Sequence, residues 1–460
     1  MKEKSKKPNR HIIAAGLVLF LLVVGLWLVR RLEGEAPQLS LLQEVEYIGG
    51  SFDLEGKVSD RKSGLRSLQI VLVSGNVEKV LHEASFPGEG FPGAGAVHSE
   101  PFSISILPRK LGLGDGKAVL RFRITDYSFR RWGEGNLTHR EIPVHIDTRP
   151  PGLQVLSRAH NLNQGGAGLI VYRVSEPGTE NGVLVGDRFF PGYEGASASD
   201  AQIHMAFFAL GYDQGPGTPM VLEALDRAGN RAVSRFPHHI NARRFPEDAI
   251  TVSDGFMETI LPQFEADDPP PAEASLLERF LKVNRDLRAR NYATTVALAK
   301  HTDRKIHWEG AFLRLPGSAS RAGFADHRTY TYEGRVVDRQ VHLGVDLAST
   351  SRSAVPAANA GRVAFAKELG IYGKTVFLDH GFGVLTGYSH LSRIDVSEGE
   401  LVSKGHILGQ TGETGLAGGD HLHFSVLVQK VFSNPIEWWD AEWIRNNLWD
   451  KIGQASAYRQ

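Results

Sequence analysis

The amino-acid sequence predicts a mainly β protein in which two β-sandwich modules precede an antiparallel β-sheet domain, with a transmembrane helix at the N-terminus and a helical linker before the last domain. Three observations lead to this prediction. An apolar run stands near the N-terminus, short stretches of alternating apolar and polar residues fill most of the chain, and proline clusters separate them. A chain of 460 residues exceeds the size of one compact core, so about three domains are expected.

The apolar run from Ile12 to Val29 is close to the roughly 20 residues that a helix needs to cross a bilayer. Five Lys or Arg residues precede it and only Arg30 and Arg31 follow closely, so the positive-inside rule predicts a cytoplasmic N-terminus. A cleaved signal peptide is disfavoured because charges follow the long run at once and Gly34-Glu35-Ala36 is the only small-x-small site. We expect an uncleaved single-pass anchor in the cytoplasmic membrane, with the bulk of the chain in the periplasm or outside the cell.

The composition excludes several partners and chemistries. The formal net charge is +0, so nothing indicates the broad basic surface that binds a nucleic-acid backbone. Because the chain has no cysteine, it has no disulfide, no thiolate metal site and no cysteine nucleophile. Any metal must therefore be held by His and carboxylate side chains.

The first two modules show the alternation that is typical of antiparallel strands. Apolar residues at 118, 120, 122 and 124 are separated by Val119, Arg121 and Arg123, and Pro150-Pro151 then breaks the chain. Asp126 followed by Gly135-Asn136 in the first module matches Asp226 followed by Gly229-Asn230 in the second. This punctuation resembles that of bacterial immunoglobulin-like modules, so the two are expected to be spacers or binding modules for a protein or glycan partner.

A helix and a further β domain follow the modules. Pro269-Pro270-Pro271 interrupts an acidic stretch, and Ser275 with Glu278 forms a capping box at the start of an apolar helical face. Strand periodicity then returns in four segments of the final domain, residues 362–365, 375–379, 384–388 and 421–428. The expected segments are the cytoplasmic tail and anchor (1–38, helix 12–29), an immunoglobulin-like module (39–149), a second such module (150–242), a helical linker (243–304), the final domain (305–447) and a tail (448–460).

Two histidine clusters of the final domain have the spacing of ligands on strands. In an extended segment His342 and Asp346 share one face with Gly344 between them, and the pair His421 and His423 also falls on one face. Two His and one carboxylate suit a zinc ion with an open coordination position, as in a hydrolytic site. Each cluster alone is weak evidence, since His-x-His on a strand is more often solvated or structural.

The last third of the chain resembles the lysostaphin-like, or LytM-type, peptidoglycan endopeptidases. The resemblance rests on an ordered series of motifs: His342-Leu343-Gly344-Val345-Asp346-Leu347-Ala348, Val355-Pro356-Ala357, Gly361-Arg362-Val363, Tyr388-Ser389-His390-Leu391, Gly409-Gln410-Thr411-Gly412 and His421-Leu422-His423-Phe424. It implies a lysostaphin-type antiparallel β-sheet peptidase domain with Zn2+ bound by His342, Asp346 and His423. It also implies that His421 and His390 are catalytic.

The sequence departs from the family's pattern beside the expected groove. Asp420 and Ser425 stand where Pro and Glu are common, residues 416–419 form an enlarged Gly-rich loop, and residues 321–340 lack the usual Phe-Gly-x-Arg turn. We expect Asp420 to be a turn residue rather than a partner of an imidazole, Tyr388 to be a packed aromatic residue, and His380 to be structural. These changes bear on substrate preference rather than on metal binding.

The expected function is that of a zinc-dependent endopeptidase that hydrolyses peptide bonds of peptidoglycan stem peptides or cross-bridges in cell-wall remodelling. The alternative is a non-hydrolytic wall-binding or regulatory protein that activates other wall hydrolases. A third hypothesis makes the two modules the main functional part. Autoinhibition is also open, with the linker helix or residues 321–340 over the groove and Asp326, His327 or Glu333 as a fourth zinc ligand.

Overall fold

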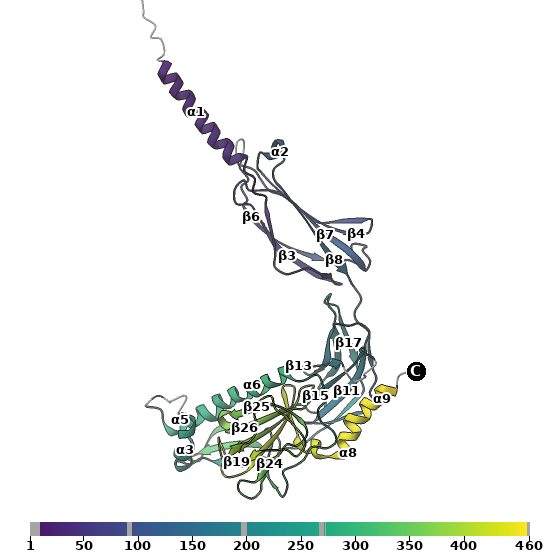
Figure 1. The fold of residues 1–460 in the computed structure, drawn as a ribbon, viewed down its shortest axis with the longest axis vertical. Coiled ribbons are helices and arrows are strands. Elements are labelled where there is room, and N and C mark those ends of the chain that lie inside the picture. The colour runs from purple at the N-terminus through teal and green to yellow at the C-terminus, as the bar shows by residue number, and fades with distance from the viewer. Residues whose placement is uncertain (1–9, 90–93, 195–199, 266–270, 272, 458–460) are drawn as a thin grey trace, which may run out of the picture. The chain divides into compact units, whose positions relative to one another are not determined.

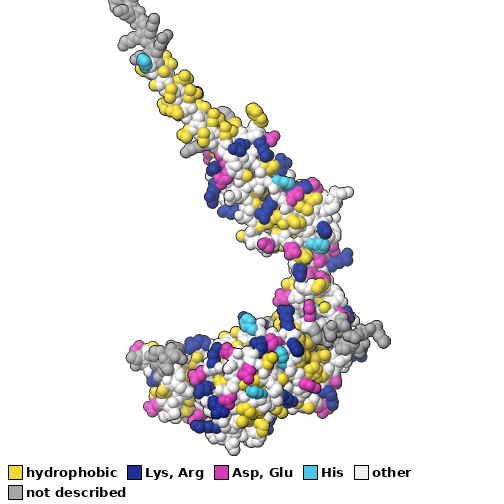
Figure 2. Space-filling model, viewed as in Figure 1, with side chains coloured by type: hydrophobic (Ala, Val, Ile, Leu, Met, Phe, Trp, Pro, Cys, Tyr) yellow, Lys and Arg dark blue, Asp and Glu magenta, His cyan; other side chains and the backbone are white. Residues whose placement is uncertain are grey.

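The computed structural model describes residues 10–89, 94–194, 200–265, 271 and 273–457, and these form a mainly β protein (Figure 1). The chain divides into two compact units: residues 1–150 with Leu225–Arg231, and residues 151–224 with 232–460. The first unit begins with helix α1 (Arg10–Arg31). Its segment His11–Val29 is long and apolar enough to cross a membrane, and Figure 2 shows apolar side chains along the face of this helix that is in view.

The first unit also contains two sheets that face one common core. The strands of the larger sheet, in spatial order, are β2 (Tyr47–Ile48), β8 (Leu137–Ile146), β7 (Gly116–Asp126), β4 (Leu65–Ser74) and β5 (Val77–Ser85). The smaller sheet contains β1 (Gln38–Leu41), β3 (Phe52–Ser59) and β6 (Ser99–Ile106), and a short helix, α2 (Arg130–Gly133), precedes β8. Leu54 of β3 and Phe122 of β7 are both fully buried in the core. The alternation predicted over residues 118–124 is therefore that of β7.

The second unit begins with further short sheets. One contains β14 (Tyr193–Glu194), β15 (Ile203–Ala209), β11 (Ala167–Val174) and β9 (Leu153–Val155). Another contains β13 (Arg188–Pro191), β12 (Glu180–Val185), β16 (Met220–Leu225) and β17 (Arg231–Arg235), and β10 (His160–Asn163) pairs with β18 (His238–Asn241). Their core continues into the rest of the unit, because Phe207 of β15 lies against Trp308, with ring centroids 6.5 Å apart.

The segment expected to be a helical linker contains a strand as well as helices. The helices are α3 (Asp254–Ile260), α4 (Pro262–Glu265), α5 (Leu276–Leu281) and α6 (Arg288–Leu298), with a π turn at Lys282–Leu287 and a 3-10 turn at Ala299–His301. The predicted capping box of Ser275 and Glu278 begins α5. The strand β19 (Glu247–Thr251) pairs in parallel with β21 (His327–Tyr332), which also pairs with β22 (Arg335–Val341). The linker thus extends a sheet of the following domain.

The final domain is built on an antiparallel sheet. Its strands, in spatial order, are β20 (Ala319–Ala322), β23 (Val345–Ala348), β31 (Leu422–Val428), β27 (Val384–Leu391), β26 (Lys374–Asp379), β25 (Gly361–Glu368) and β29 (Leu401–Val402), and β32 (Val431–Ser433) pairs with β31. A small sheet contains β24 (Ala354–Pro356), β30 (Ile407–Gln410) and β28 (Arg393–Ile394). A 3-10 turn (Gly370–Tyr372) precedes β26, and α7 (Pro435–Trp439), α8 (Ala441–Ile444), a π turn (Arg445–Trp449) and α9 (Asp450–Ala457) follow the sheet. The four strand segments predicted from periodicity lie in β25, β26, β27 and β31.

Candidate metal centre and active site

Strand pairing brings the two histidine clusters together. Asp346 of β23 is the register partner of His423 of β31, and Ser389 of β27 faces His423 from the other side. His390 is the next residue of β27. Because side chains alternate along a strand, the apolar residues Val345 and Phe424 point to the core and leave the polar ones on the site face. The adjacent strands β23, β31 and β27 therefore carry most of the candidate site.

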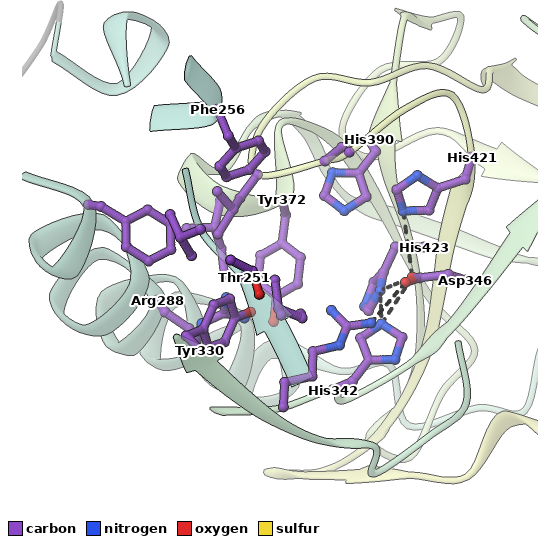
Figure 3. A pocket seen from close by; sticks show the side chains of 18 residues that line it. Thr251, Phe256, Arg288, Tyr330, His342, Asp346, Tyr372, His390, His421 and His423 are labelled. Atoms are coloured by element: carbon purple, nitrogen blue, oxygen red, sulfur yellow. Dashed lines mark hydrogen bonds and ion pairs between the residues drawn. The ribbon is translucent and has the colours of Figure 1, made fainter. Parts of the chain in front are cut away.

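Three side chains meet at one point of this face (Figure 3). His342 Nε2 lies 3.0 Å from Asp346 Oδ1 and 2.9 Å from His423 Nδ1, and His423 Nδ1 lies 2.9 Å from Asp346 Oδ1. Ligand distances of about 2.0–2.2 Å in a tetrahedral site place neighbouring ligand atoms about 3.3 Å apart. The three atoms are therefore close to the spacing that a single small cation requires.

The backbone around His342 and His423 explains their orientation. His342 Nδ1 lies 2.7 Å from the carbonyl oxygen of Gly323, which only accepts, so Nδ1 carries the proton and Nε2 presents a lone pair to the cluster. A Cβ atom on Gly344 would lie 2.5 Å from Cε1 and Nε2 of His423. Glycine at 344 thus makes the space that the second ring fills.

The donor set fits a metal ion. Two imidazole nitrogens and one carboxylate oxygen form the set that zinc accepts at hydrolytic sites. His423 Nε2 is buried and has no hydrogen-bond partner among the described residues. No described protein group on that side of the ring therefore accepts a proton from it. Within the described chain, His342, Asp346 and His423 form the one candidate group that contains histidine. Asp326, His327 and Glu333 do not belong to this group.

The electrostatics favour an ionised Asp346 carboxylate beside a neutral His423 ring. Burial opposes the ionisation of Asp346, but the charge and hydrogen bond of His342 and the hydrogen bond of His423 outweigh it and hold the pKa of Asp346 well below its usual range. Burial lowers the pKa of His423 to about 4, with only partial compensation from Asp346. Neutral imidazoles and a carboxylate are the protonation states that bind a cation.

Two further histidines, His390 and His421, lie beside this group. Their ring centroids are 4.8 Å apart, and His421 Nε2 lies 3.6 Å from Asp346 Oδ1. His421 Nδ1 donates to the carbonyl oxygen of Gly419, and His390 Nδ1 donates to that of Thr414. The donor–acceptor distance is 2.7 Å in both hydrogen bonds. Both rings therefore present an unprotonated Nε2. Burial, together with the neighbouring His421 and His423, lowers the pKa of His390 to about 3.

His390 has an unusual backbone conformation. Its φ of 63° lies in the left-handed region, which non-glycine residues adopt at a cost of about 1–3 kcal/mol. Such strain persists only where the surrounding structure imposes it, and it concentrates at functional sites. The conformation directs the ring at the end of β27 toward His421 in Figure 3.

A pocket of about 250 Å³ opens over the five side chains, and the linker forms its opposite wall. The wall residues that the sequence did not reveal are Thr251 of β19, Phe256 of α3, Phe280 of α5, Arg288 of α6, and Arg328 and Tyr330 of β21. Arg328 reaches furthest, because its Nη2 lies 3.2 Å from Asp346 Oδ2. No short motif marks these residues. Their place depends on the pairing of β19 with β21, which the sequence spacing does not disclose.

Three neighbouring residues have structural contacts. Asp420 accepts hydrogen bonds from the Ser351 hydroxyl and the Arg352 amide rather than from an imidazole. Tyr388 is buried, and its hydroxyl accepts a hydrogen bond from the Ala358 amide. His380 is also fully buried and contacts the Ala360 carbonyl and the Thr386 hydroxyl.

Comparison with known proteins assigns the final domain to a class. Residues 340–435 match the model of peptidase family M23, whose members are metallopeptidases, so the last domain is an M23 peptidase domain.

Similar proteins include the peptidoglycan DD-endopeptidase ShyB of Vibrio cholerae, 34% identical over 125 residues that cover 26% of this chain and 29% of the relative. The DD-carboxypeptidase/endopeptidase Mpg of Neisseria meningitidis is 35% identical over 97 residues, which cover 21% and 22% of the two chains. The chain thus spans less than a third of the length of these relatives. A crystal structure described as a putative peptidase M23 from Pseudomonas aeruginosa is 21% identical, with a TM-score of 0.39, and covers 60% of this chain and 93% of its own.

Proposed function

We propose that the protein is a zinc-dependent endopeptidase that hydrolyses peptide bonds of peptidoglycan stem peptides or cross-bridges in cell-wall remodelling. The observation that carries the proposal is the triangle of His342, Asp346 and His423 with His390 and His421 beside it, inside the segment that matches family M23. The name of the similar Vibrio cholerae protein, a peptidoglycan DD-endopeptidase, supports peptidoglycan as the substrate.

His342 Nε2, Asp346 Oδ1 and His423 Nδ1 would hold the zinc ion. When bound, zinc supplies a Lewis acid that activates water near neutral pH and polarises the scissile carbonyl. His342 is kept in the required tautomer by its hydrogen bond to Gly323, and Arg328 holds the second oxygen of Asp346. These contacts fix the orientation of two of the three proposed ligands.

His421 is the proposed general base. Its Nδ1–H is engaged by the Gly419 carbonyl, so Nε2 accepts the proton of the attacking water. The Asp346 carboxylate 3.6 Å away stabilises the imidazolium that results.

His390 is the proposed partner on the leaving-group side. Its Nδ1–H is engaged by the Thr414 carbonyl, so Nε2 donates to the oxyanion or to the leaving amine only after it has gained a proton. Its lowered pKa makes the ring neutral at rest, and an imidazolium there is a strong acid. The proton that His421 removes from the water is the one available for this step, because the two rings lie side by side with centroids 4.8 Å apart.

The remainder of the chain would place this activity at the cell wall. We propose that α1 anchors the protein in the cytoplasmic membrane, with the bulk of the chain in the periplasm or outside the cell. The two sandwich modules, proposed to be immunoglobulin-like, would act as spacers or bind a protein or glycan partner.

A reporter that works only in the periplasm, fused after Leu39, tests the proposed anchor and should be active in intact cells. A soluble mature protein that starts near Ala36 would contradict the anchor.

The full chain in detergent, incubated with purified peptidoglycan, tests the activity. We expect soluble fragments whose masses correspond to cleaved peptide bonds, loss of the fragments on removal of zinc, and their return on its addition. The alternative function is that of a non-hydrolytic wall-binding or regulatory protein. The presence of all three proposed zinc ligands argues against this alternative. Zinc binding without cleavage, combined with stimulation of a separate wall hydrolase, would favour that alternative.

A further inference from the structure

A second group of buried acidic side chains lies in the first unit. Glu33 follows α1, Asp60 follows β3, and Asp126 is the last residue of β7. Their side chains are 8%, 3% and 0% exposed, and one carboxylate oxygen from each lies within 4.8 Å of the others. Three carboxylates in this small buried volume repel one another strongly unless protons or a cation compensate their charges.

The protein leaves one of these oxygens without a partner. Asp60 Oδ1 accepts hydrogen bonds from the amides of Lys62 and Gly64 at 3.1 and 2.6 Å. Asp60 Oδ2 is buried and has no hydrogen-bond partner among the described residues. Since the amides occupy Oδ1, Oδ2 is the Asp60 oxygen that a bound cation would satisfy. A buried acceptor in this state costs about 1–3 kcal/mol, and more when it is charged.

One side-chain amide lies within hydrogen-bond distance of four oxygens in the same buried region. Asn136 Nδ2 lies 2.8 Å from Asp126 Oδ2, 3.0 Å from Glu33 Oε1, and 3.2 and 3.3 Å from the carbonyl oxygens of Glu33 and Glu35. An amide nitrogen has only two protons. Two of the four oxygens are therefore left to other donors, and the Ser63 and Ser128 hydroxyls donate to Glu33 Oε1 and to the Glu33 carbonyl oxygen at 2.8 and 2.9 Å.

Lys62, a cation two residues from Asp60, is turned to another partner. Lys62 Nζ pairs with Glu35 at 3.0 Å, and its side chain is 53% exposed. Neutral groups donate to the carboxylates, among them the Ser63 hydroxyl and the Glu35 amide on Glu33 and the backbone amides of Ser128 and Asn136 on Asp126. Neutral donors orient the carboxylates but do not cancel their charge.

We propose that Glu33, Asp60 and Asp126 bind a calcium ion. Two oxygens bound to one calcium ion at about 2.4 Å are at most about 4.8 Å apart, and the three carboxylate oxygens lie within this limit of one another. A set made only of oxygen ligands, with no imidazole, suits a hard cation and differs in kind from the proposed zinc site. Bound calcium would tie the segment after α1 to the ends of β3 and β7.

Calcium binding to the full chain in detergent tests this site. The protein is freed of calcium, loaded with zinc, and titrated with calcium chloride in a calorimeter and in thermal unfolding. We expect one saturable site and a higher melting temperature for the first unit. Asp60→Asn should weaken calcium binding about tenfold or more and remove the temperature shift, because it withdraws one charged ligand. Asp53→Asn, which removes an exposed charge from β3, should bind calcium as the unaltered chain does.

A terbium luminescence measurement on the unaltered chain gives a result that does not depend on folding of the variant. We expect terbium to bind and calcium to displace it, with magnesium much less effective because it needs a near-ideal octahedron. The absence of saturable calcium binding at millimolar concentration would overturn the proposal. Equal calcium affinity of Asp60→Asn and the unaltered chain would overturn it as well.

Discussion

Arg328 Nη2 lies 3.2 Å from Asp346 Oδ2, so a residue of β21 contacts the carboxylate of the candidate metal centre. The contact leaves Asp346 Oδ1 to the two histidines. Both side chains are mostly shielded, at 20% and 13% exposure, so solvent screens the pair less than it would a surface ion pair. Arg328 therefore fixes which oxygen of Asp346 would face a bound metal ion.

Replacing Arg328 with Gln should weaken the metal centre without abolishing it. Loss of a group that orients a ligand typically costs about 10- to 100-fold in metal affinity or activity. We expect a loss of this size in zinc affinity, measured by competition with a chelator of known affinity. Arg314→Gln, which alters an arginine outside the pocket lining, is the matched control. Unchanged zinc affinity in Arg328→Gln would mean that the contact does not orient Asp346.

Substitution of His423 and of His421 should separate a ligand from a base. His423→Ala leaves two ligand atoms and should lose most of the zinc, whereas His421→Ala should retain it. Both variants should be nearly inactive on peptidoglycan, since a general base contributes about 10²- to 10⁴-fold. Zinc stoichiometry on folded protein is the measurement, with His406→Ala as the control. Equal loss of zinc from both variants would contradict the proposed roles.

His390 should affect activity and stability in different ways. His390→Ala and His390→Gly should both retain zinc and lose about 10²- to 10³-fold in activity, as for a removed oxyanion donor. Because φ is 63°, the glycine variant should be at least as stable as the alanine variant although it buries one carbon fewer. Urea unfolding compares the two. An alanine variant clearly more stable than the glycine variant would show that the left-handed conformation relaxes on substitution.

Glu437 of α7 should make the second unit less stable as pH rises. Burial raises its pKa to about 7 from 4.5, against the hydrogen bonds from Asn163 and the Ala167 amide. Between these pH values the folded state binds more protons than the unfolded state, so stability falls as pH rises and the loss approaches about 3 kcal/mol above pH 7. Glu437→Gln removes this titration.

The measurement is the difference in free energy of unfolding between Glu437→Gln and the unaltered chain from pH 5 to pH 8. We expect this difference to move by about 2–3 kcal/mol in favour of the variant across that range. His160 and His380, whose pKa values burial lowers to about 4, are present in both proteins, so their contribution cancels. A difference that is independent of pH would contradict the raised pKa.

Truncation should show that the final domain depends on the chain before it. A protein of residues 275–460 lacks β19 and α3, and with them the buried side chains of Val252, Met257, Ile260 and Leu261. We expect residues 151–460 to melt cooperatively and residues 275–460 to aggregate or melt broadly, because removal of a core face exposes its apolar partners. Cooperative unfolding of the shorter protein at a similar temperature would contradict this dependence.

The sequence predicted the site better than its surroundings. The two-residue period of a strand places His342 near Asp346 and His421 near His423, and the ordered motifs then indicate that the two strands meet. The tautomers of His390 and His421 could not be predicted, because they depend on the Thr414 and Gly419 carbonyls in loops. The apolar alternation of 118–124 and the capping box of Ser275 are local patterns, and both were predicted correctly.

Contacts between residues that are far apart in the chain could not be predicted from the sequence. The pairing of Glu247 with His327 joins residues 80 positions apart, and no motif marks either strand. The core shared by Phe207 and Trp308 likewise follows from packing rather than from periodicity. Glu33, Asp60 and Asp126 come from three separate segments of the sequence. The only pattern that marked any of them was Asp126 followed by Gly135-Asn136.

The parallel pairing of β19 with β21 has a consequence for transplanting this enzyme. A fusion that takes only residues 340–435, the segment shared with the family, would carry the proposed ligands and bases but would leave Thr251, Phe256 and Arg328 behind. The donated segment would then face solvent where the native pocket has a wall. Libraries that aim to change substrate choice should accordingly include residues 247–332, which contribute pocket-lining residues that the common peptidase segment does not contain.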